Sequence, residues 1–390
     1  MKKLALSLIG LAILASCSTP NVTESSSIEE GALAYESGSS LIFTEFYVGT
    51  SVNDRAVEIS NIGDKKIDLS EYSIIIYRSG SLSDPYEIKL KGEISPKTPY
   101  VVAYKGSNEK ILAVTNQTDE LFPNIGKYPM VLAHGNKKVD TLGVPGYSTT
   151  WCESLDMVRK NEYYYGADIF EPYDYIGYSN VNSERLGKYG CPISENELLK
   201  GPSITQEFYS LPFLQNDTTG GGGFTEVTIA SYGDGDTTRF NYSSEVNAAG
   251  YEDGHSCRYE NLDTPETQHG TSINAQPWGY AAADYTNSIL KKAKKFMLQS
   301  LPGVSVTETF GRLLCYVWAS NEESGDLSSY FLVNYFIVLN GYSKVQFSGD
   351  TSGKMLINGI SYYQYMKDAE NKAAKEGLRV HGQKDPNFNY

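Results

Sequence analysis

The sequence predicts a mainly β protein of two domains, and three observations carry this prediction. A chain of 390 residues is long enough for two or three domains that each bury a core. Short apolar runs recur between turn signals from residue 41 to residue 190 without a sustained helical period, which is typical of a β-sandwich. Helical patterns occur only in the second half of the chain. This half is therefore expected to combine strands with helices.

The composition excludes two classes of protein. Hydrophobic residues make up 40% of the chain and aromatic residues 12%, which is too apolar for wholesale disorder. A polytopic membrane protein would need several apolar runs of about 20 residues, and the sequence has no such series. The formal net charge of −14 argues at first against a nucleic-acid partner, because phosphate binding normally uses an excess of Lys and Arg.

The N-terminus has the pattern of an export signal. Met1-Lys2-Lys3 precedes an apolar run from Leu4 to Ala15, too short for a stable membrane span. Residues 14–17, Leu-Ala-Ser-Cys, resemble the lipobox of bacterial lipoproteins. The resemblance implies cleavage after residue 16, a lipid on Cys17, and attachment to the bacterial cell membrane facing outside the cytoplasm. The alternative is an ordinary signal with an incidental Cys. Residues 17–40, rich in Ser, Thr and Glu, are expected to form a flexible tether.

The other four cysteines permit two disulfides in an exported protein. Four cysteines allow three connectivities, and pairing within domains favours Cys152 with Cys191 and Cys257 with Cys315. No CxxC motif or Cys/His cluster is present, so a zinc site is not expected.

Residues 41–190 are predicted to form the first domain. Strand-like runs occur at residues 41–43, 56–59, 72–77, 100–103 and 130–132. The segments 44–46, 57–61, 67–72 and 100–103, with Ser154-Leu155 and residues 158–160, resemble the lamin tail domain. The resemblance implies an immunoglobulin-like β-sandwich. In exported bacterial proteins this module often accompanies nuclease or phosphatase domains, so it implies binding of an unknown surface ligand or a positioning role. A structural spacer is the alternative.

Residues 191–223 are predicted to form a linker. The segment ends in four consecutive glycines, Gly220 to Gly223. Ordering four glycines in a helix or strand costs more conformational entropy than ordering other residues, so we expect a flexible hinge there.

Residues 224–390 contain three ordered motifs. The first is Asp-Gly-Asp-Thr at 234–237, the second is Arg258 followed by Asp-Thr-Pro-Glu-Thr at 263–267, and the third is Phe-Gly-Arg-Leu at 310–313. Together they resemble the staphylococcal nuclease (thermonuclease) family. The resemblance implies a five-stranded OB-type barrel with helices. Amphipathic patterns at residues 280–300 and 362–376 predict two helices.

The resemblance also assigns roles to the motif residues. Asp236, Asp263 and the Thr264 carbonyl match metal ligands, and their hard oxygens suit Ca²⁺. Arg258 and Arg312 match two phosphate-binding guanidiniums, whose planar forks donate bidentately to phosphoryl oxygens. Glu266 matches a carboxylate that acts as general base or orients water. Phe310 and Phe347 fall where the family has tyrosines near the nucleotide, and phenylalanine retains the stacking face. Asp234 is expected to shape its turn.

The sequence therefore predicts a membrane-anchored, Ca²⁺-dependent nuclease that cleaves DNA, RNA or both. The resemblance implies 3′-phosphorylated products. The alternatives are a non-catalytic nucleic-acid-binding lipoprotein and an adhesin built around the first domain. The acidic charge no longer excludes a nucleic-acid substrate, because only Arg258 and Arg312 are needed at the phosphate. It does predict modest and salt-sensitive affinity.

Overall fold

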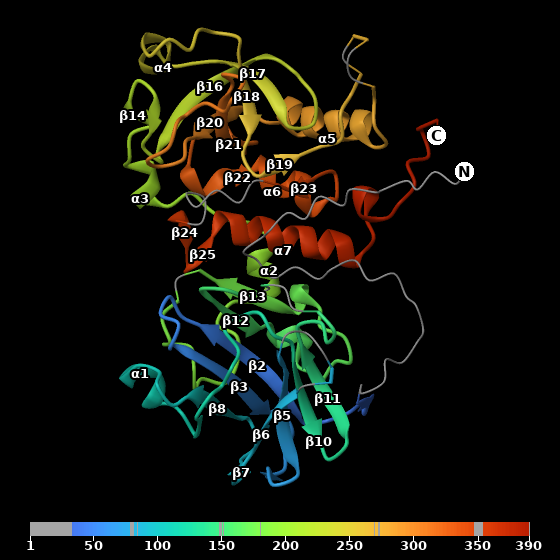
Figure 1. The fold of residues 1–390 in the computed structure, drawn as a ribbon. Coiled ribbons are helices and arrows are strands. Elements are labelled where there is room, and N and C mark those ends of the chain that lie inside the picture. The colour runs from blue at the N-terminus through green and yellow to red at the C-terminus, as the bar shows by residue number, and fades with distance from the viewer. Residues whose placement is uncertain are drawn as a thin grey trace, which may run out of the picture.

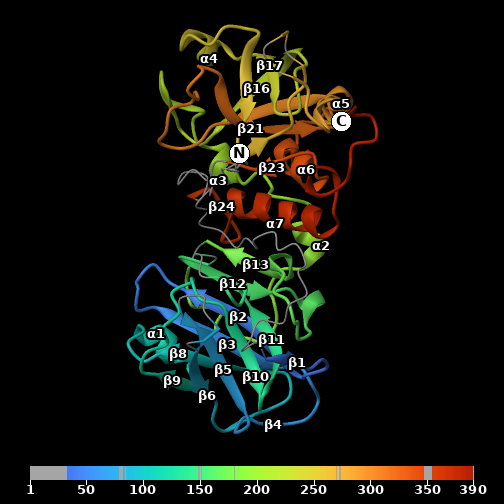
Figure 2. The ribbon, with the colours of Figure 1, turned by 45° about the vertical axis from the view of Figure 1, so that its right-hand side comes forward.

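The computed structural model describes residues 33–78, 82–83, 85–147, 150, 152–179, 181–268, 270–271, 274–346 and 354–389. The predicted signal, Cys17, the first part of the tether and Phe347 lie outside the described residues. The described chain is mainly β, as predicted. Figures 1 and 2 show two bodies with helix α7 (Tyr362–Lys375) lying between them. No helix in the described ranges combines the length and apolarity that crossing a membrane requires.

The N-terminal body consists of two sheets around one apolar core. The larger sheet has the order β13-β12-β2-β3-β8-β9 and the smaller β1-β11-β10-β5-β6. Phe43 and Ile59 from the larger sheet meet Ile76 and Leu132 from the smaller one in a single cluster. The strands are β1 Ala34–Tyr35, β2 Leu41–Val48, β3 Arg55–Asn61, β5 Tyr72–Tyr77, β6 Pro85–Lys89, β8 Thr98–Tyr104, β9 Gln117–Asp119, β10 Met130–His134, β11 Lys137–Leu142, β12 Leu155–Arg159 and β13 Tyr175–Tyr178. Each strand-like run predicted for this region lies in one of these strands.

A β-bulge explains why strand β2 departs from simple alternation. Its register against β3 shifts between Phe43 and Glu45, and the extra residue reverses the facing of the residues that follow. Leu41 and Phe43 before the bulge and Phe46 after it therefore all reach the core between the sheets. Glu45 faces the opposite side, where burial raises its pKa well above the usual range.

The C-terminal body is built on a sheet that closes on itself. Its order is β18-β17-β16-β20-β21-β22, and an additional parallel pairing joins β18 to β21. Strand β21 pairs with β18, β20 and β22, which explains its nearly continuous apolar sequence. The strands are β16 Phe224–Ser231, β17 Thr237–Asn241, β18 His255–Tyr259, β20 Lys295–Gln299, β21 Leu313–Ser320 and β22 Tyr330–Leu332.

The two predicted helices have different outcomes. Residues 362–376 form α7 nearly as predicted. The helix predicted over 280–300 is α5 (Gly279–Lys292) only, and the remainder becomes strand β20. In β20, Met297 and Leu298 are buried because the strand lies between β16 and β21. A short apolar run of this kind does not distinguish strand from helix without its partners.

The glycine run is packed against the C-terminal body, contrary to the predicted flexible hinge. The N–H of Gly220 donates to the carbonyl of Val304 at 2.9 Å, and the N–H of Gly222 donates to Ser300 Oγ at 3.1 Å. The N–H groups of Gly221 and Gly223 donate to carbonyls within the segment, at residues 213 and 212. The 191–223 segment also contains helices α2 (Glu195–Leu198) and α3 (Gln206–Tyr209) and strands β14 (Leu214–Asn216) and β15 (Thr219–Gly220). The glycines permit close backbone approach here, which a sequence pattern cannot distinguish from flexibility.

We expect Gly223→Ala to destabilise the protein by about 3 kcal/mol, because overpacking forces the backbone apart. A Cβ at Gly223 would lie 1.9 Å from the carbonyl oxygen of Leu211. The comparison is Gly303→Ala, where φ is +76° and no atom lies within 4 Å of the added Cβ. That variant should lose only about 1 kcal/mol through backbone strain. Denaturant unfolding measures both values, and equal losses would contradict the packed arrangement.

The predicted disulfides are absent, and all four described cysteines are buried free thiols. Cys152 belongs to the core of the N-terminal body, whereas Cys191 belongs to the other large apolar cluster. Cys257 and Cys315 lie on the paired strands β18 and β21, two positions out of register, and their thiols are neighbours that form no disulfide. An even number of cysteines permits disulfides but does not indicate where the cysteines lie in the fold.

Helix α7 joins the two bodies through buried contacts. Lys160 Nζ bonds Asp368 Oδ1 at 2.9 Å, with the Lys160 side chain fully buried and that of Asp368 10% exposed. Gly177 of β13 packs so closely on α7 that a Cβ there would lie 2.7 Å from the side chain of Gln364. Val158 and Ile176 of the N-terminal body belong to the same apolar cluster as Met366. The two bodies therefore share a core.

Candidate active site

Asp236 lies at the centre of the candidate site. It ends the turn between β16 and β17 and is only 1% exposed. Its Oδ2 accepts hydrogen bonds from the N–H and Oγ1 of Thr264 at 2.8 and 2.9 Å. Helix α5 supports the turn, since Thr286 Oγ1 donates to the carbonyl of Gly235 at 2.7 Å. A Cβ at Gly235 would lie 2.7 Å from Thr264 Oγ1, so glycine allows this approach.

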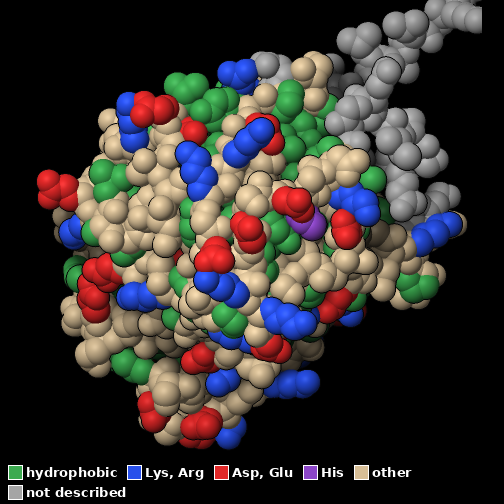
Figure 3. Space-filling model, turned by 90° about the horizontal axis from the view of Figure 1, so that it is seen from below, with side chains coloured by type: hydrophobic (Ala, Val, Ile, Leu, Met, Phe, Trp, Pro, Cys, Tyr) green, Lys and Arg blue, Asp and Glu red, His purple; other side chains and the backbone are tan. Residues whose placement is uncertain are grey.

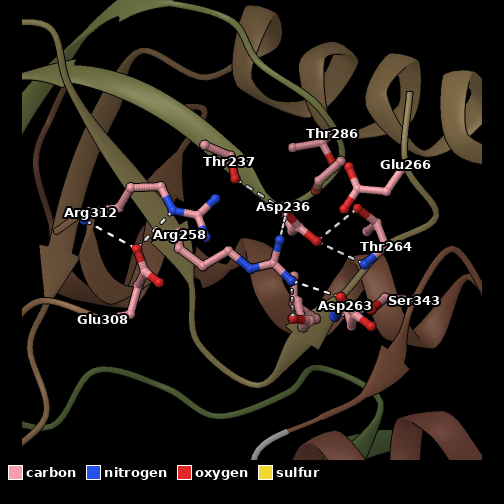
Figure 4. A network of polar contacts seen from close by, with 12 residues as sticks. Asp236, Thr237, Arg258, Asp263, Thr264, Glu266, Thr286, Glu308, Arg312 and Ser343 are labelled. Carbon is pink, nitrogen blue, oxygen red and sulfur yellow. Dashed lines mark hydrogen bonds and ion pairs between the residues drawn. The ribbon is translucent and has the colours of Figure 1, made fainter. Parts of the chain in front are cut away.

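Arg258 connects the two acidic residues that the sequence places 27 positions apart. It lies on β18 opposite Thr237, the residue that follows Asp236. Its Nη1 donates to Asp236 Oδ1 at 2.5 Å, and its Nη2 donates to Asp263 Oδ1 at 2.9 Å and to the carbonyl of Leu262 at 3.0 Å. Figure 4 shows the guanidinium between the two carboxylates. The strand pairing thus brings the first motif against the second.

The second motif turns sharply after β18 to bring Asp263 back to the site. Asn261 has a left-handed backbone with φ of 59°, a conformation that asparagine tolerates better than most residues. Its side-chain oxygen accepts a 2.5 Å hydrogen bond from Tyr316 of β21. Asp263 then lies in β19 (Leu262–Asp263), where its N–H donates to Ser343 Oγ at 3.0 Å. The Asp263 side chain is 47% exposed and accessible to a ligand.

Glu266 and Arg312 flank Asp236 from opposite sides, as Figure 4 shows. The backbone of Glu266 is fixed by Gln276, which accepts from its N–H at 3.0 Å and donates to its carbonyl at 2.9 Å. Arg312 Nε donates to Glu308 Oε1 at 2.9 Å, and its side chain is 32% exposed. Phe310 is 83% exposed, with its ring centroid 5.8 Å from the guanidinium carbon of Arg312. The structure therefore brings together all the predicted site residues that it describes.

Burial has the largest effect on the pKa of Asp236. It raises the pKa of this carboxyl to about 6, although the nearby Arg258 acts in the opposite direction. A nearby second carboxylate, Asp234, adds to the increase. The ionised form is therefore held mainly by the guanidinium and by the hydrogen bonds from Thr264.

In their donor chemistry, the site residues fit Ca²⁺, the hard cation that the sequence implies. Among the described residues, no group of three or more His, Cys, Asp or Glu side chains is arranged as a metal centre. However, Asp236 Oδ1 and Asp263 Oδ1 lie within hydrogen-bond distance of one guanidinium. The Arg258 guanidinium lies between these two oxygens in this structure, and the fit to Ca²⁺ rests on donor type, because carboxylate and carbonyl oxygens are the ligands Ca²⁺ prefers.

Sequence reasoning missed four residues that shape this site. Thr286 and Ser343 support it through hydrogen bonds to backbone groups that are distant in the sequence, and no local sequence pattern indicated their roles. Glu308 precedes Arg312 by four residues, a spacing that could have suggested the ion pair. The fourth is His255, whose Nε2 lies 2.8 Å from the carbonyl of Gly311.

The closed strand arrangement thus carries one arginine between two carboxylates and a second arginine beside it. Comparison with protein families is more specific: residues 256–380 match the family model described as Staphylococcal nuclease homologue. The C-terminal body therefore contains a staphylococcal nuclease-like domain. The match includes Arg258, Asp263, Glu266 and Arg312, while Asp236 precedes it. A search of curated proteins found no match.

Proposed function

We propose that this protein is a Ca²⁺-dependent nuclease that hydrolyses phosphodiester bonds of DNA, RNA or both and leaves 3′-phosphorylated products. The observation that carries the proposal is the Arg258 bridge between Asp236 and Asp263, with Arg312 nearby, in a domain of nuclease family type. A phosphodiester is anionic, so its hydrolysis requires charge neutralisation and a positioned water. The site offers groups for both tasks.

Each proposed role follows from chemistry and position. Asp236, Asp263 and the Thr264 carbonyl would hold the Ca²⁺, which neutralises phosphate charge when bound. Arg258 and Arg312 bind the phosphoryl oxygens and stabilise the charge that develops during attack. Glu266 accepts a proton from the attacking water or orients it. The exposed ring of Phe310 supplies a surface on which a base stacks.

The remaining parts of the proposal concern the N-terminal half. We propose that residues 1–16 are a lipoprotein signal and that a lipid on Cys17 anchors the mature protein outside the cytoplasm. We also propose a lamin tail-type, immunoglobulin-like sandwich for the N-terminal body and an OB-type barrel for the nuclease-like domain.

Figure 3 views the end of the N-terminal body that lies furthest from α7. Acidic and basic side chains alternate there, and the described residues on this face form no basic patch.

The decisive experiment incubates purified residues 18–390 with plasmid DNA and with RNA, in Ca²⁺ or in EGTA. We expect degradation that EGTA abolishes, and end-group analysis should identify 3′-phosphates. Binding without cleavage in Ca²⁺ would instead support the non-catalytic alternative. If the protein neither cleaves nor binds nucleic acid, the adhesin alternative remains, and a pull-down with surface material would test it.

We expect Ca²⁺ affinity to fall as the pH is lowered through about 6. Because burial raises the pKa of Asp236 to about 6, this carboxyl holds a proton below that pH and is ionised above it. A proton and a cation compete for the same oxygens, so affinity should fall about tenfold per pH unit below 6. Calorimetric titration between pH 5 and pH 7 measures the effect. A constant affinity over this range would contradict the role of Asp236.

A further inference from the structure

A short turn ahead of β21 presents Arg312 to the candidate site. Thr307 and Leu313 face each other as an antiparallel bridge. Within that bridge, the N–H of Glu308 donates to the carbonyl of Arg312 at 3.0 Å, and the N–H of Gly311 donates to the carbonyl of Glu308 at 2.9 Å. Gly311 has φ of +81°, as the tight reversal requires. The backbone on both sides of Arg312 is therefore fixed.

The side chain of Glu308 then fixes the Arg312 side chain itself. Its Oε1 accepts from the backbone N–H of Arg312 at 3.2 Å and from Arg312 Nε at 2.9 Å. The Glu308 side chain is 16% exposed, so water competes weakly for these bonds. Burial alone would raise the pKa of Glu308, but hydrogen bonds from Arg312 and from the N–H of Phe310 lower it overall. Glu308 is thus a stable anion at neutral pH.

His255 attaches the same turn to the neighbouring strand. Its Nε2 lies 2.8 Å from the carbonyl oxygen of Gly311, and because a carbonyl only accepts, Nε2 is the donor. Its ring lies 5.6 Å from that of Tyr251. The turn is therefore held at its tip by β18, the strand that also carries Arg258.

We propose that Glu308 is the positioning residue for Arg312 and that His255 assists it by fixing the turn. This inference rests on the proposed nuclease function. Glu308 uses Nε and leaves both terminal nitrogens of Arg312 available, and Figure 4 shows them directed toward Asp236. The described residues supply no acceptor to these nitrogens. The guanidinium is thereby presented as a preformed fork for two phosphoryl oxygens.

Three substitutions at Glu308 separate placement from charge. Glu308→Gln keeps the length and an accepting oxygen but loses the charge, so kcat should remain within about fivefold of the parent. Glu308→Asp keeps the charge but shortens the reach, and Glu308→Ala removes both. We expect each of these two variants to lose about 10- to 100-fold in kcat, the usual cost of losing an orienting partner. KM should change less than kcat, because Arg312 acts mainly on charge that develops during the reaction.

The matched control is Glu376→Ala, which removes an exposed i,i+4 partner of Lys372 on α7 and should leave kcat unchanged. A nitrogen-15 NMR spectrum adds a readout that is independent of turnover. The Arg312 Nε–H signal should be protected from exchange in the parent and in Glu308→Gln, and should lose protection in Glu308→Ala. His255→Ala should lower kcat in the same direction by a smaller factor.

The opposite pattern, with activity kept by Glu308→Asp and lost by Glu308→Gln, would show that charge and not placement matters, and would overturn the inference. Unchanged kcat in Glu308→Ala would overturn it as well. If the parent protein cleaves no nucleic acid, the proposed function itself has failed. The NMR protection of Arg312 Nε–H in the parent still tests the geometry in that case, and its absence would reject the positioning role independently.

Discussion

Replacing Arg312 with alanine is expected to lower the rate of nucleic-acid cleavage by about 10³-fold or more while the protein stays folded. An arginine that stabilises a phosphoryl transition state contributes about 10³ to 10⁵ in kcat. Arg312 is one-third exposed and its only side-chain hydrogen-bond partner among the described residues is Glu308. Glu308 also receives bonds from backbone N–H groups, which remain in the variant. The loss should therefore concern activity and not stability.

Arg239→Ala provides the matched control, because Arg239 lies on β17 of the same sheet and is exposed, and its side chain donates to the carbonyl of Gly254 at 3.1 Å. Cleavage of plasmid DNA under excess Ca²⁺ measures both variants, and a thermal melt verifies folding. Asp236→Asn should abolish cleavage as well, with some loss of stability, because Asp236 is buried and accepts from Thr264 and Arg258. Full activity in Arg312→Ala would reject the assigned site.

Replacing Lys160 with methionine is expected to destabilise the whole protein by about 3–5 kcal/mol, the usual cost of leaving a buried charge without its partner. In the variant Asp368 stays buried without its partner. Burial raises the pKa of Asp368, and the opposing effect of Lys160 is lost. Lys160 Nζ also lies 3.5 Å from the ring centroid of Tyr173, and that contact is lost too. Denaturant unfolding should give one transition for both bodies, shifted to lower denaturant concentration.

The double variant Lys160→Met with Asp368→Leu should recover most of this loss, because a buried ion pair replaced by apolar side chains is often neutral or stabilising. Removing Glu376 from its exposed pair with Lys372 should cost at most about 1 kcal/mol. Separate transitions for the two bodies would contradict the shared core. A chain ending at Gly190 would also separate Lys160 from Asp368, so truncation there is a poor test of an adhesin role.

The local parts of the fold could be predicted from the sequence. Strands β2, β3, β5, β8 and β10 follow from apolar runs between turn signals, and helix α7 follows from an amphipathic pattern that ends at Gly377. The motif residues were also visible, because DGDT, the Arg258 segment and the Arg312 segment keep a characteristic order. Each of these signals lies within a few neighbouring residues of the chain.

The parts that depend on distant partners could not be predicted. Residues 295–299 looked like the end of a helix and became a strand because β16 and β21 lie on either side. The four glycines looked flexible, but Gly221 and Gly223 pack against carbonyls of residues 211–213, and Gly220 and Gly222 pack against residues 300–304. The cysteines permitted disulfides, but Cys152 and Cys191 lie in different apolar clusters, and Cys257 and Cys315 are free thiols although they are neighbours. Nothing near Lys160 indicated that it would meet Asp368.

The sequence by itself determined the mainly β character of this protein, the set of candidate site residues and an acidic net charge of −14, which predicts weak binding of nucleic acid. The tertiary structure decided how these residues meet. Pairing of β17 with β18 places Arg258 between Asp236 and Asp263, and the turn at Glu308 orients Arg312. Short-range patterns set the conformation of each element, whereas the pKa of Asp236 and the direction of Arg312 depend on burial and on partners that only the folded chain provides.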